Sequence, residues 1–516
     1  MSLGKTAVIL GGSIAGMCAA GAVAPHFDEV IILERDVIAD NMEHRRGVPQ
    51  SKHPHFLLNS GRRAMDTLFP GYEDDLIAAG GMHLMPSVSA AHCEGAGWIP
   101  RAESTMSMVY ASRLLIERVL RNKLAEVTGI TVLEGVNVTG LETVDGGLPG
   151  GAVTGVWLTG GDKGPAKRLI EADLVIDTLG RGSAVSAWLE KAGWPAPPVQ
   201  SLDAGCTYTT QWFQKPTERP DDWWWHHMSI MPTQEWAPHP VEHDFISQIF
   251  PIEGDRVLVT MGSWGHPMPR TEDDFIQTTR RLRAPAFAKA VERCTPLSKV
   301  FVTKSTGNMR KRYDKLDNPP IGLLVIGDAI CGFNPFYAQG MSSAGKCSVL
   351  LGQMLRERDS AIEPGFYKAY FAEQSKLLDD IWTLALARDR GYANATGTDT
   401  APRWQQRLTQ RLSWPLFNLL SAATREDPHL EAHFTAVFNL DESVTDMVRD
   451  RRFLTGMARF AVKKALKRNR LPIGFDQELD PPSQIYRDFT APPGGPATVI
   501  ERPATAPPAS ETSPVA

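Results

Sequence analysis

The stretch Lys5-Thr-Ala-Val-Ile-Leu-Gly-Gly-Ser-Ile-Ala-Gly16 has the pattern of a buried strand, a tight turn and the start of a helix. Residues 7–10 form a short apolar run of the kind found in parallel sheets. Gly11 and Gly12 permit the turn, and Gly16 lets the helix pack closely on the strand. A helix N-terminus at this place offers free N–H groups and a positive dipole end to a pyrophosphate. The stretch therefore predicts a dinucleotide-binding unit.

A second strand and an acid complete this unit. Residues 31–33 are apolar, and Glu34 follows at about the offset where a carboxylate accepts ribose hydroxyls. Ser13 replaces the second glycine that is usual in such turns. We also expect Ala15 and Arg35 to contact the nucleotide. Because the first strand begins so early, we expect these residues to be part of the fold and not a secretion signal.

Composition limits the classes of function. The chain has 516 residues and a net charge of −5, enough for two or three domains. The charge argues against a nucleic-acid partner, since no excess of cations exists to neutralise phosphates. The sequence has no run of eighteen apolar residues, the length that a helix needs to span a bilayer. Residues 447–470 are basic and amphipathic, which favours a solvated helix face over contact with a membrane surface.

Cysteine and histidine patterns predict no metal. The six cysteines are scattered without the close pairs of zinc or redox motifs. We interpret them as free thiols in a reducing cytoplasm. The histidines likewise show no spacing that indicates a ligand set.

Nucleotide-binding signatures return twice downstream. Residues 172–183 form an apolar strand that ends in Asp177, and Gly180 allows a tight exit. Residues 322–344 form a strand, a Gly-Asp turn at Asp328, and a loop into a helix. An acid directly after a buried strand is costly unless it is paired or hydrogen-bonded. Asp328 is therefore predicted to have a functional partner.

Together the three segments resemble the FAD-dependent monooxygenases of the aromatic hydroxylase and epoxidase superfamily. The resemblance implies an α/β fold with a Rossmann-like FAD-binding domain of the glutathione reductase and aromatic hydroxylase type. An antiparallel-sheet substrate domain would be inserted into it, and a helical region would follow. We expect a discontinuous FAD-binding domain at 1–80, 105–190 and 300–356, a substrate domain at 81–104 and 191–299, helices at 357–491 and a disordered tail at 492–516.

The segment Arg45-Arg-Gly-Val-Pro-Gln-Ser-Lys-His-Pro-His55 sharpens this resemblance. It is similar to a segment of bacterial flavin epoxidases that act on polyketide olefins in polyether biosynthesis. The resemblance implies that Arg46, Gln50 and His55 lie near the flavin. It also implies that Arg113 reaches the phosphate and ribityl region, and that Asp328 bonds the ribityl hydroxyls.

The loop 334–341 is predicted to deliver a helix N-terminus at Gly340 and Met341. Its N–H groups and dipole would stabilise negative charge on a reduced flavin. Pro335 is expected beside the cofactor. We therefore predict a catalytic group of four residues, namely Gln339, Gly340, Met341 and Arg46.

Aromatic residues mark the expected substrate domain. Alternating runs at 206–213 and 256–261 predict an antiparallel sheet. In the family such a sheet roofs the flavin, so we expect a pocket for a large apolar substrate. Its candidate wall residues are Trp212, Trp224, Phe250, Phe336 and Tyr337.

The resulting hypothesis is an FAD monooxygenase of secondary metabolism that transfers one oxygen atom from a flavin C4a-hydroperoxide, derived from O2, to an olefin or an electron-rich ring. NAD(P)H or a separate flavin reductase would supply electrons. One alternative is a flavin-dependent halogenase, although no lysine occurs between Lys52 and Lys123. Others are a reductase or dehydrogenase of isoprenoid double bonds and a carrier without flavin. Substrate identity and oligomeric state stay open.

Overall fold

The structure is a computed structural model. It describes residues 2–38, 43–94, 97–103, 106–161, 164–220, 223–231, 245–303, 307–408, 411–412, 414–468, 476, 478–487 and 498–500.

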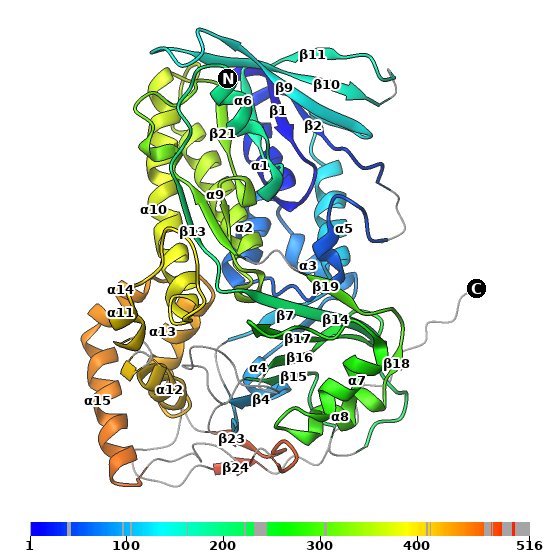
Figure 1. Cartoon of the computed structure of the whole chain (residues 1–516), viewed down its shortest axis with the longest axis vertical. Coiled ribbons are helices and arrows are strands. Elements are labelled where there is room, and N and C mark those ends of the chain that lie inside the picture. Colours follow the sequence, from blue (N-terminus) through cyan, green and yellow to red (C-terminus); the bar gives the residue numbers. More distant parts are fainter. Residues whose placement is uncertain are drawn as a thin grey trace.

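A five-stranded parallel sheet forms the centre of the upper half in Figure 1. Its order is β21 (Leu323–Val325), β12 (Leu174–Asp177), β1 (Gly4–Leu10), β2 (Phe27–Leu33) and β8 (Ile130–Leu133). The three central strands are apolar and buried over residues 7–10, 30–33 and 174–176, as expected for a parallel sheet covered on both faces. This is the sheet that residues 5–36 predicted.

Helices and a second sheet cover the parallel sheet. Helices α1 (Ile14–Val23) and α10 (Pro364–Asp389) contact its strands, and α2 (Asn59–Leu68), α5 (Arg113–Ala125) and α9 (Gly340–Arg356) pack against α1. The antiparallel sheet of β9 (Val136–Val144), β10 (Ala152–Gly160) and β11 (Arg168–Glu171) contacts β12 and β2, and α6 (Val185–Lys191) contacts β9. Gly16 brings α1 close to the turn, since an added Cβ would lie 1.8 Å from the Gly11 carbonyl oxygen.

A second large sheet has eight strands. Its members are β18 (Thr295–Pro296), β19 (Phe301–Thr303), β14 (Cys206–Gln214), β17 (Arg256–Trp264), β16 (Ile246–Ile252), β15 (His227–Ile230), β4 (Ala90–Glu94) and β5 (Gly97–Trp98). The predicted antiparallel runs are thus confirmed as the paired strands β14 and β17.

The two faces of this sheet have different neighbours. One face packs into an apolar core with α7 (Glu272–Arg280) and α8 (Pro285–Glu292), and includes Met228, Ile249 and Val259. Side chains alternate between faces along each strand. The other face therefore turns toward the parallel sheet, and we call it the roof.

Smaller elements connect these parts. They are α3 (Tyr72–Ala78), α4 (Pro86–Ser89), β3 (Met82–Leu84) paired with β7 (Met108–Tyr110), and the sheet of β13 (Val199–Leu202), β20 (Asn308–Lys311) and β22 (Cys331–Gly332). A third small sheet joins β6 (Arg101–Ala102), β23 (Ile485–Arg487) and β24 (Thr498–Ile500). Within the tail predicted to be disordered, residues 498–500 thus form a paired strand, and the rest lies outside the described residues.

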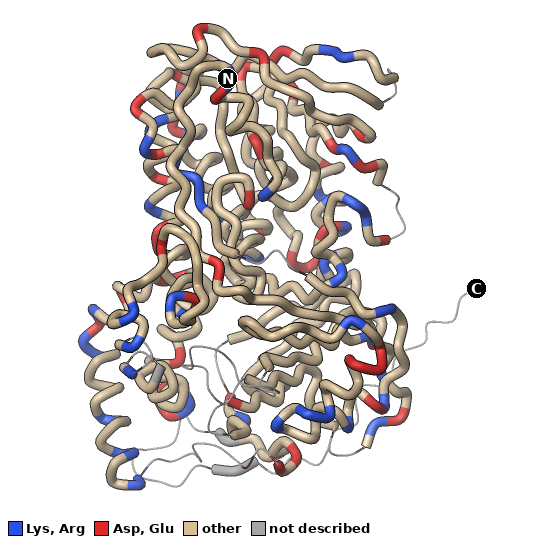
Figure 2. The backbone as a smooth tube through the Cα atoms, in the orientation of Figure 1, with Lys and Arg blue, Asp and Glu red and all other residues tan. Residues whose placement is uncertain are grey.

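The C-terminal region is helical. After α10 come α11 (Arg403–Leu408), α12 (Trp414–Ala423), α13 (Pro428–Phe438), α14 (Val444–Arg449) and α15 (Arg451–Ala465). Figure 2 shows Lys and Arg along α15, whose apolar residues Phe453 and Phe460 are buried. No helix among the described residues is long and apolar enough to cross a membrane. All six cysteines are buried and free.

Candidate functional site

A cavity of about 760 Å³ lies between the parallel sheet and the roof. Residues that directly follow β1, β2, β12 and β21 line one side of it, namely Gly11, Glu34, Thr178 and Gly327. The carboxyl ends of parallel strands are where α/β folds bind ligands. The volume is in the range of small-molecule sites, about 300–1,000 Å³.

The N-terminus of α1 opens onto this cavity. Its N-cap residue, Ser13, makes no capping hydrogen bond through its side chain. Instead, Ser13 Oγ accepts a 2.8 Å hydrogen bond from the guanidinium of Arg113, which is itself 5 % exposed. A cation and free helical N–H groups thus lie at one place, which is suited to an anionic group.

Glu34 is fixed beside this turn. Its Oε2 accepts a 3.0 Å hydrogen bond from Gly12 N–H, and its Oε1 accepts a 2.9 Å bond from Asp36 N–H. Arg45 Nη1 lies 3.0 Å from Glu34 Oε2, and the same guanidinium is bonded to Glu117. Burial opposes the charge of Arg45, but Glu117 and Glu34 outweigh it and raise its pKa. Glu34 is therefore oriented at the cavity and paired with a cation.

A glycine turn after β12 forms another part of the wall. Asp177 is fully buried and accepts hydrogen bonds from Leu179 N–H at 3.0 Å and from the Ser183 hydroxyl at 2.5 Å. It shapes the turn from behind and does not line the cavity. Gly180 has φ +77° with open space where a Cβ would lie, so the wall is left clear for a ligand.

Asp328 faces the cavity from the turn after β21. Its side chain is 41 % exposed toward this space, and Arg181 Nε lies 3.6 Å from Oδ2. Arg181 also donates to the carbonyl oxygens of Gly307 and Phe333. The aspartate predicted to have a partner is thus paired with a cation while one side stays open to a ligand.

Helix α9 begins at the far side of the cavity. Gln339, Gly340 and Met341 line it, and the Gln339 side chain makes no capping hydrogen bond. Gln339 Oε1 is buried without a hydrogen-bond partner. A second helix N-terminus therefore opens onto the same cavity as α1, together with an unsatisfied polar atom.

The loop before α9 is anchored by Asp389, the last residue of α10. This carboxylate is 1 % exposed and accepts hydrogen bonds from Tyr337 Oη (2.5 Å), Asn308 Nδ2 (2.8 Å), Trp264 Nε1 (3.0 Å) and Asn334 Nδ2 (3.2 Å). Burial raises the pKa of Asp389, and these four donors oppose that rise. One carboxylate thus joins the loop, the roof and the C-terminal helices.

A polar row crosses the roof. Ser229 lies opposite Gln248, Gln248 opposite Thr260, and Thr260 opposite Thr210. Gln248 and Thr260 line the cavity, together with Tyr208 from the neighbouring row. No lysine and no carboxylate stands among the roof residues that the structure describes in the cavity wall.

His53, from the segment 45–55, joins the cavity wall to this polar row. The Thr260 hydroxyl donates to Thr209 O at 2.8 Å, so at 2.7 Å it accepts from the Thr210 hydroxyl. Thr210 Oγ1, 2.8 Å from His53 Nδ1, must then accept from a protonated Nδ1. Burial lowers the pKa of His53 to about 3. His53 is therefore neutral, with Nε2 as its hydrogen-bond acceptor.

The cavity gathers most of the residues predicted from the sequence. Those that line it are Gly11, Gly12, Ser13, Ala15, Glu34, Arg35, Gln50, His55, Arg113, Gly180, Asp328, Pro335, Phe336, Gln339, Gly340 and Met341. His55 Nδ1 is hydrogen-bonded to His53 O at 2.9 Å, and burial lowers the pKa of His55 to about 4.

Other predicted residues lie elsewhere. Arg46 lines a neighbouring cavity of about 400 Å³, and its neighbour Arg45 lines both. Trp212 and Phe250 are on the roof face but pack in the main apolar core. Trp224 lies under the guanidinium of Arg101 at 3.7 Å. Tyr337 does not line the cavity, because its hydroxyl is bonded to Asp389. Gly16 does not line it either, because it packs against the Gly11 carbonyl.

Sequence reasoning missed several wall residues. Arg45, Arg181, Tyr208, Gln248 and Thr260 were not singled out. The alternation in residues 206–213 and 256–261 is consistent with Tyr208 and Thr260 on the same face of one sheet. Only the register between the two strands shows that they are neighbours.

Comparisons with known proteins bear on the fold. No family model matches the chain. Protein Rv3254 of Mycobacterium tuberculosis is 28% identical over 451 residues, which are 85% of this chain and 90% of that protein. The flavin-dependent brominase Bmp2 superposes with a TM-score of 0.57 at 14% identity, covering 90% of this chain and 100% of Bmp2. The p-nitrophenol 4-monooxygenase PnpA from Pseudomonas putida gives 0.59 at 13% identity, covering 86% and 99%.

The chain has the FAD-dependent hydroxylase and halogenase fold. The predicted fold class is confirmed by these superpositions. In this fold the cavity occupies the space between the parallel sheet and the roof sheet, which explains why segments so distant in sequence converge.

Proposed function

We propose that this chain is an FAD-dependent monooxygenase that acts on a large, mostly apolar small molecule. The observation that carries the proposal is one cavity that extends from two helix N-termini, α1 and α9, to a roof without charged groups among its described wall residues. One end suits a dinucleotide, and the other, which is uncharged but includes Gln248 and Thr260, suits a neutral substrate that has a few polar groups besides its apolar surface.

Features of the wall support FAD as the cofactor. The α1 and α9 N-termini have no side-chain caps, and Gln339 Oε1 is buried without a partner. The open side of Gly180 leaves room for a ligand. Unsatisfied polar groups of this kind are costly unless a ligand or water bonds them. The residues present therefore fit a nucleotide cofactor.

Each group has an expected role. Glu34 would accept the ribose hydroxyls, Arg113 and the α1 N-terminus would bind the pyrophosphate, and Asp328 would accept the ribityl hydroxyls. The N–H groups of Gly340 and Met341 would stabilise negative charge on the reduced ring. FAD, when bound, would supply the reduction of O2 and the transfer of one oxygen atom.

The roof would orient the substrate and exclude water. In the balanced reaction the substrate gains one atom of O2, and the other leaves as water. NAD(P)H, directly or through a separate reductase, provides two electrons, and a proton is consumed. No acid or base stands among the described roof residues of the wall, so we place the chemistry on the cofactor and the selection of substrate on Tyr208, Gln248, Thr260 and Phe336.

Epoxidation of an olefin is the finer form of this proposal. It is supported by the segment 45–55, whose residues Gln50, His53 and His55 line the cavity. Hydroxylation of an electron-rich ring uses the same parts. Halogenation is disfavoured because no lysine is among the described residues of the wall, and halogenases need one to capture hypohalous acid.

Labelled oxygen provides the test. The purified protein would be loaded with FAD, supplied with NADPH and a flavin reductase, and incubated under 18O2 with olefins and phenols, with bromide present. A product heavier by one 18O atom supports the proposal. A brominated product would assign halogenation, and conversion without O2 would assign a reductase or dehydrogenase. A protein that does not bind FAD would overturn the proposal.

A further inference from the structure

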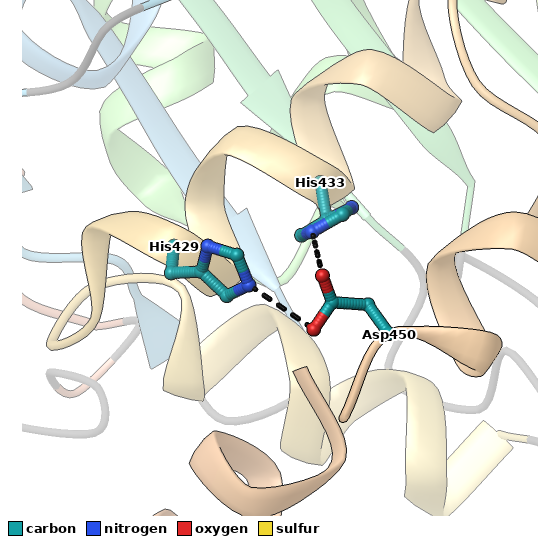
Figure 3. A group of neighbouring side chains, drawn as sticks. All are labelled: His429, His433 and Asp450. Atoms are coloured by element: carbon teal, nitrogen blue, oxygen red, sulfur yellow. Dashed lines mark ion pairs between the residues drawn. The ribbon is translucent and has the colours of Figure 1, made fainter. Parts of the chain in front are cut away.

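Two histidines of the C-terminal region face one carboxylate. His429 and His433 are one turn apart on α13, and Asp450 is the N-cap of α15. Figure 3 shows both rings turned toward the Asp450 carboxylate. His429 Nε2 lies 3.5 Å from Oδ1, and His433 Nε2 lies 3.5 Å from Oδ2. The rings are edge to face with their centroids 4.6 Å apart.

Glu442 fixes the tautomer of His433. His433 Nδ1 lies 2.8 Å and 2.7 Å from the two carboxylate oxygens of Glu442, so Nδ1 carries a proton and donates it. In the neutral ring, Nε2 then holds a lone pair. This lone pair faces Asp450 Oδ2, which also has only lone pairs. Two such acceptors are held together only by a cation between them, either a proton or a metal ion.

The distances favour a metal ion. A hydrogen bond between imidazolium and carboxylate is about 2.7–2.9 Å long, so 3.5 Å is too long. Two ligands on one tetrahedral Zn²⁺, with bonds of about 2.0–2.1 Å, lie about 3.3 Å apart. One donor atom from each of His429, His433 and Asp450 lies within 4.8 Å of the others. Small ring movements would bring all three to bonding distance.

The surroundings are those of a ligand set. Asp450 Oδ1 accepts from Arg452 N–H at 2.5 Å and Phe453 N–H at 3.0 Å, which fixes the carboxylate and leaves Oδ2 toward His433. His429 Nε2 is buried without a hydrogen bond. Glu442 stands in the place of the carboxylate that commonly orients a metal-binding histidine from behind.

We propose that His429, His433 and Asp450 bind one divalent transition-metal ion of the Zn²⁺ type, with water in the remaining position. Imidazole and carboxylate ligands suit Zn²⁺. The ion would join α13 to the start of α15 and so stabilise the C-terminal helices. No metal site was predicted from the sequence, because the third ligand is seventeen residues beyond the second and belongs to another helix. The site is independent of the proposed flavin chemistry.

Titration of the full chain with ZnCl2 tests this site. After treatment with a chelator, calorimetry of the wild-type protein is expected to show one equivalent bound through these residues. The His429→Ala/His433→Ala variant should lose that equivalent. Asp450→Asn should weaken binding at least tenfold while it keeps the α15 cap, since Asn caps a helix as well as Asp. Glu442→Gln should weaken it roughly 10–100-fold.

Two further measurements make the result decisive. His83→Ala, a change at an exposed histidine, should bind like the wild type. Zn²⁺ should raise the unfolding temperature of the wild type and not that of Asp450→Asn. Absence of saturable binding, or equal binding by the Asp450→Asn variant and the wild type, would overturn the proposal and assign the cation between the rings and Asp450 to a proton.

Discussion

The Tyr337 hydroxyl donates a 2.5 Å hydrogen bond to Asp389 across 52 residues of sequence. It ties the loop that enters α9 to the end of α10. Because Asn308, Trp264 and Asn334 donate to the same carboxylate, the position of the α9 N-terminus depends on a residue that does not line the cavity.

Asp389→Asn should therefore weaken FAD binding. The carboxamide has one acceptor oxygen in place of two, and its NH2 group would face hydrogen-bond donors. The variant could therefore not accept all four hydrogen bonds that Asp389 accepts, and the loop 334–339 would lose its anchor. We expect at least a tenfold rise in the dissociation constant of FAD, measured by flavin fluorescence. Asp399→Asn is the matched control, because Asp399 also accepts from a tryptophan, Trp382, at 3.0 Å but contacts no residue of the loop in the hydrogen bonds described. Equal effects of both changes would remove Asp389 from this role.

The two adjacent arginines should behave differently. Arg45 bridges Glu34 and Glu117, whereas Arg46 is exposed toward the smaller cavity. Arg45→Ala removes the cation described beside the buried Glu34, while Glu117 keeps Arg113 and Arg121, so we expect weaker FAD binding and a lower unfolding temperature. Arg46→Ala should bind FAD like the wild type. The dissociation constants of the two variants decide the assignment, and a stronger effect at Arg46 would return it to the flavin site.

Asp328→Ala is expected to bind FAD at least tenfold more weakly, because the open carboxylate would no longer accept ribityl hydroxyls. Asp317→Ala serves as the control, since that side chain is exposed and far from the cavity wall. Flavin content after gel filtration gives the result. Wild-type content in Asp328→Ala would contradict the cofactor role of this residue.

Substrate selection should depend on the aromatic residue in the cavity wall and not on the aromatic residues of the core. Phe336→Ala enlarges the cavity and should shift the range of oxidised substrates toward bulkier molecules, with FAD content unchanged. Phe250→Ala empties part of the core and should cost about 3–5 kcal/mol of stability, with the substrate range unchanged. Product profiles and unfolding curves of both variants separate the two roles. A changed substrate range in Phe250→Ala alone would show that the core residue selects the substrate.

His53 predicts a dependence of stability on pH. Its pKa is about 3 in the folded chain, against about 6.5 when unfolded. The unfolded chain binds the proton first, so stability is full above pH 6.5 and falls as the pH drops toward 3. At pH 5 the loss is about 2 kcal/mol for this residue. In His53→Gln, the denaturation midpoint should change less between pH 7 and pH 5 than it does in the wild type. An unchanged slope would assign the effect to other histidines whose pKa is lowered by burial, among them His55, His92 and His227.

Local patterns carried the prediction of the cofactor side. Gly11, Gly16, Glu34 and Asp328 each follow a strand within a few residues, so contiguous sequence shows both the element and the side chain that ends it. The roof could not be predicted in the same way. Trp212 and Tyr208 have the same parity on β14, but one lies over the core and the other over the cavity.

Long-range relationships were beyond sequence reasoning. Asp389 meets Trp264 across 125 residues, and no spacing marks that contact. Arg46 was predicted at the site, whereas the structure puts its neighbour Arg45 in the wall of the main cavity, since the direction of a side chain in an irregular loop depends on its partners. Arg45 has three carboxylates around it, namely Glu34, Asp36 and Glu117.

The strict alternation of the roof strands sets a rule for altering this protein. In β16 and β17, neighbouring residues lie on opposite faces of the sheet. Gln248 and Thr260 line the cavity, while Ile249 and Val259 pack in the core with α7 and α8. A mutational library at positions 208 and 248 would therefore change the cavity wall without changing the core packed against α7 and α8. A deletion of one residue in either strand would exchange the two sets and lose both.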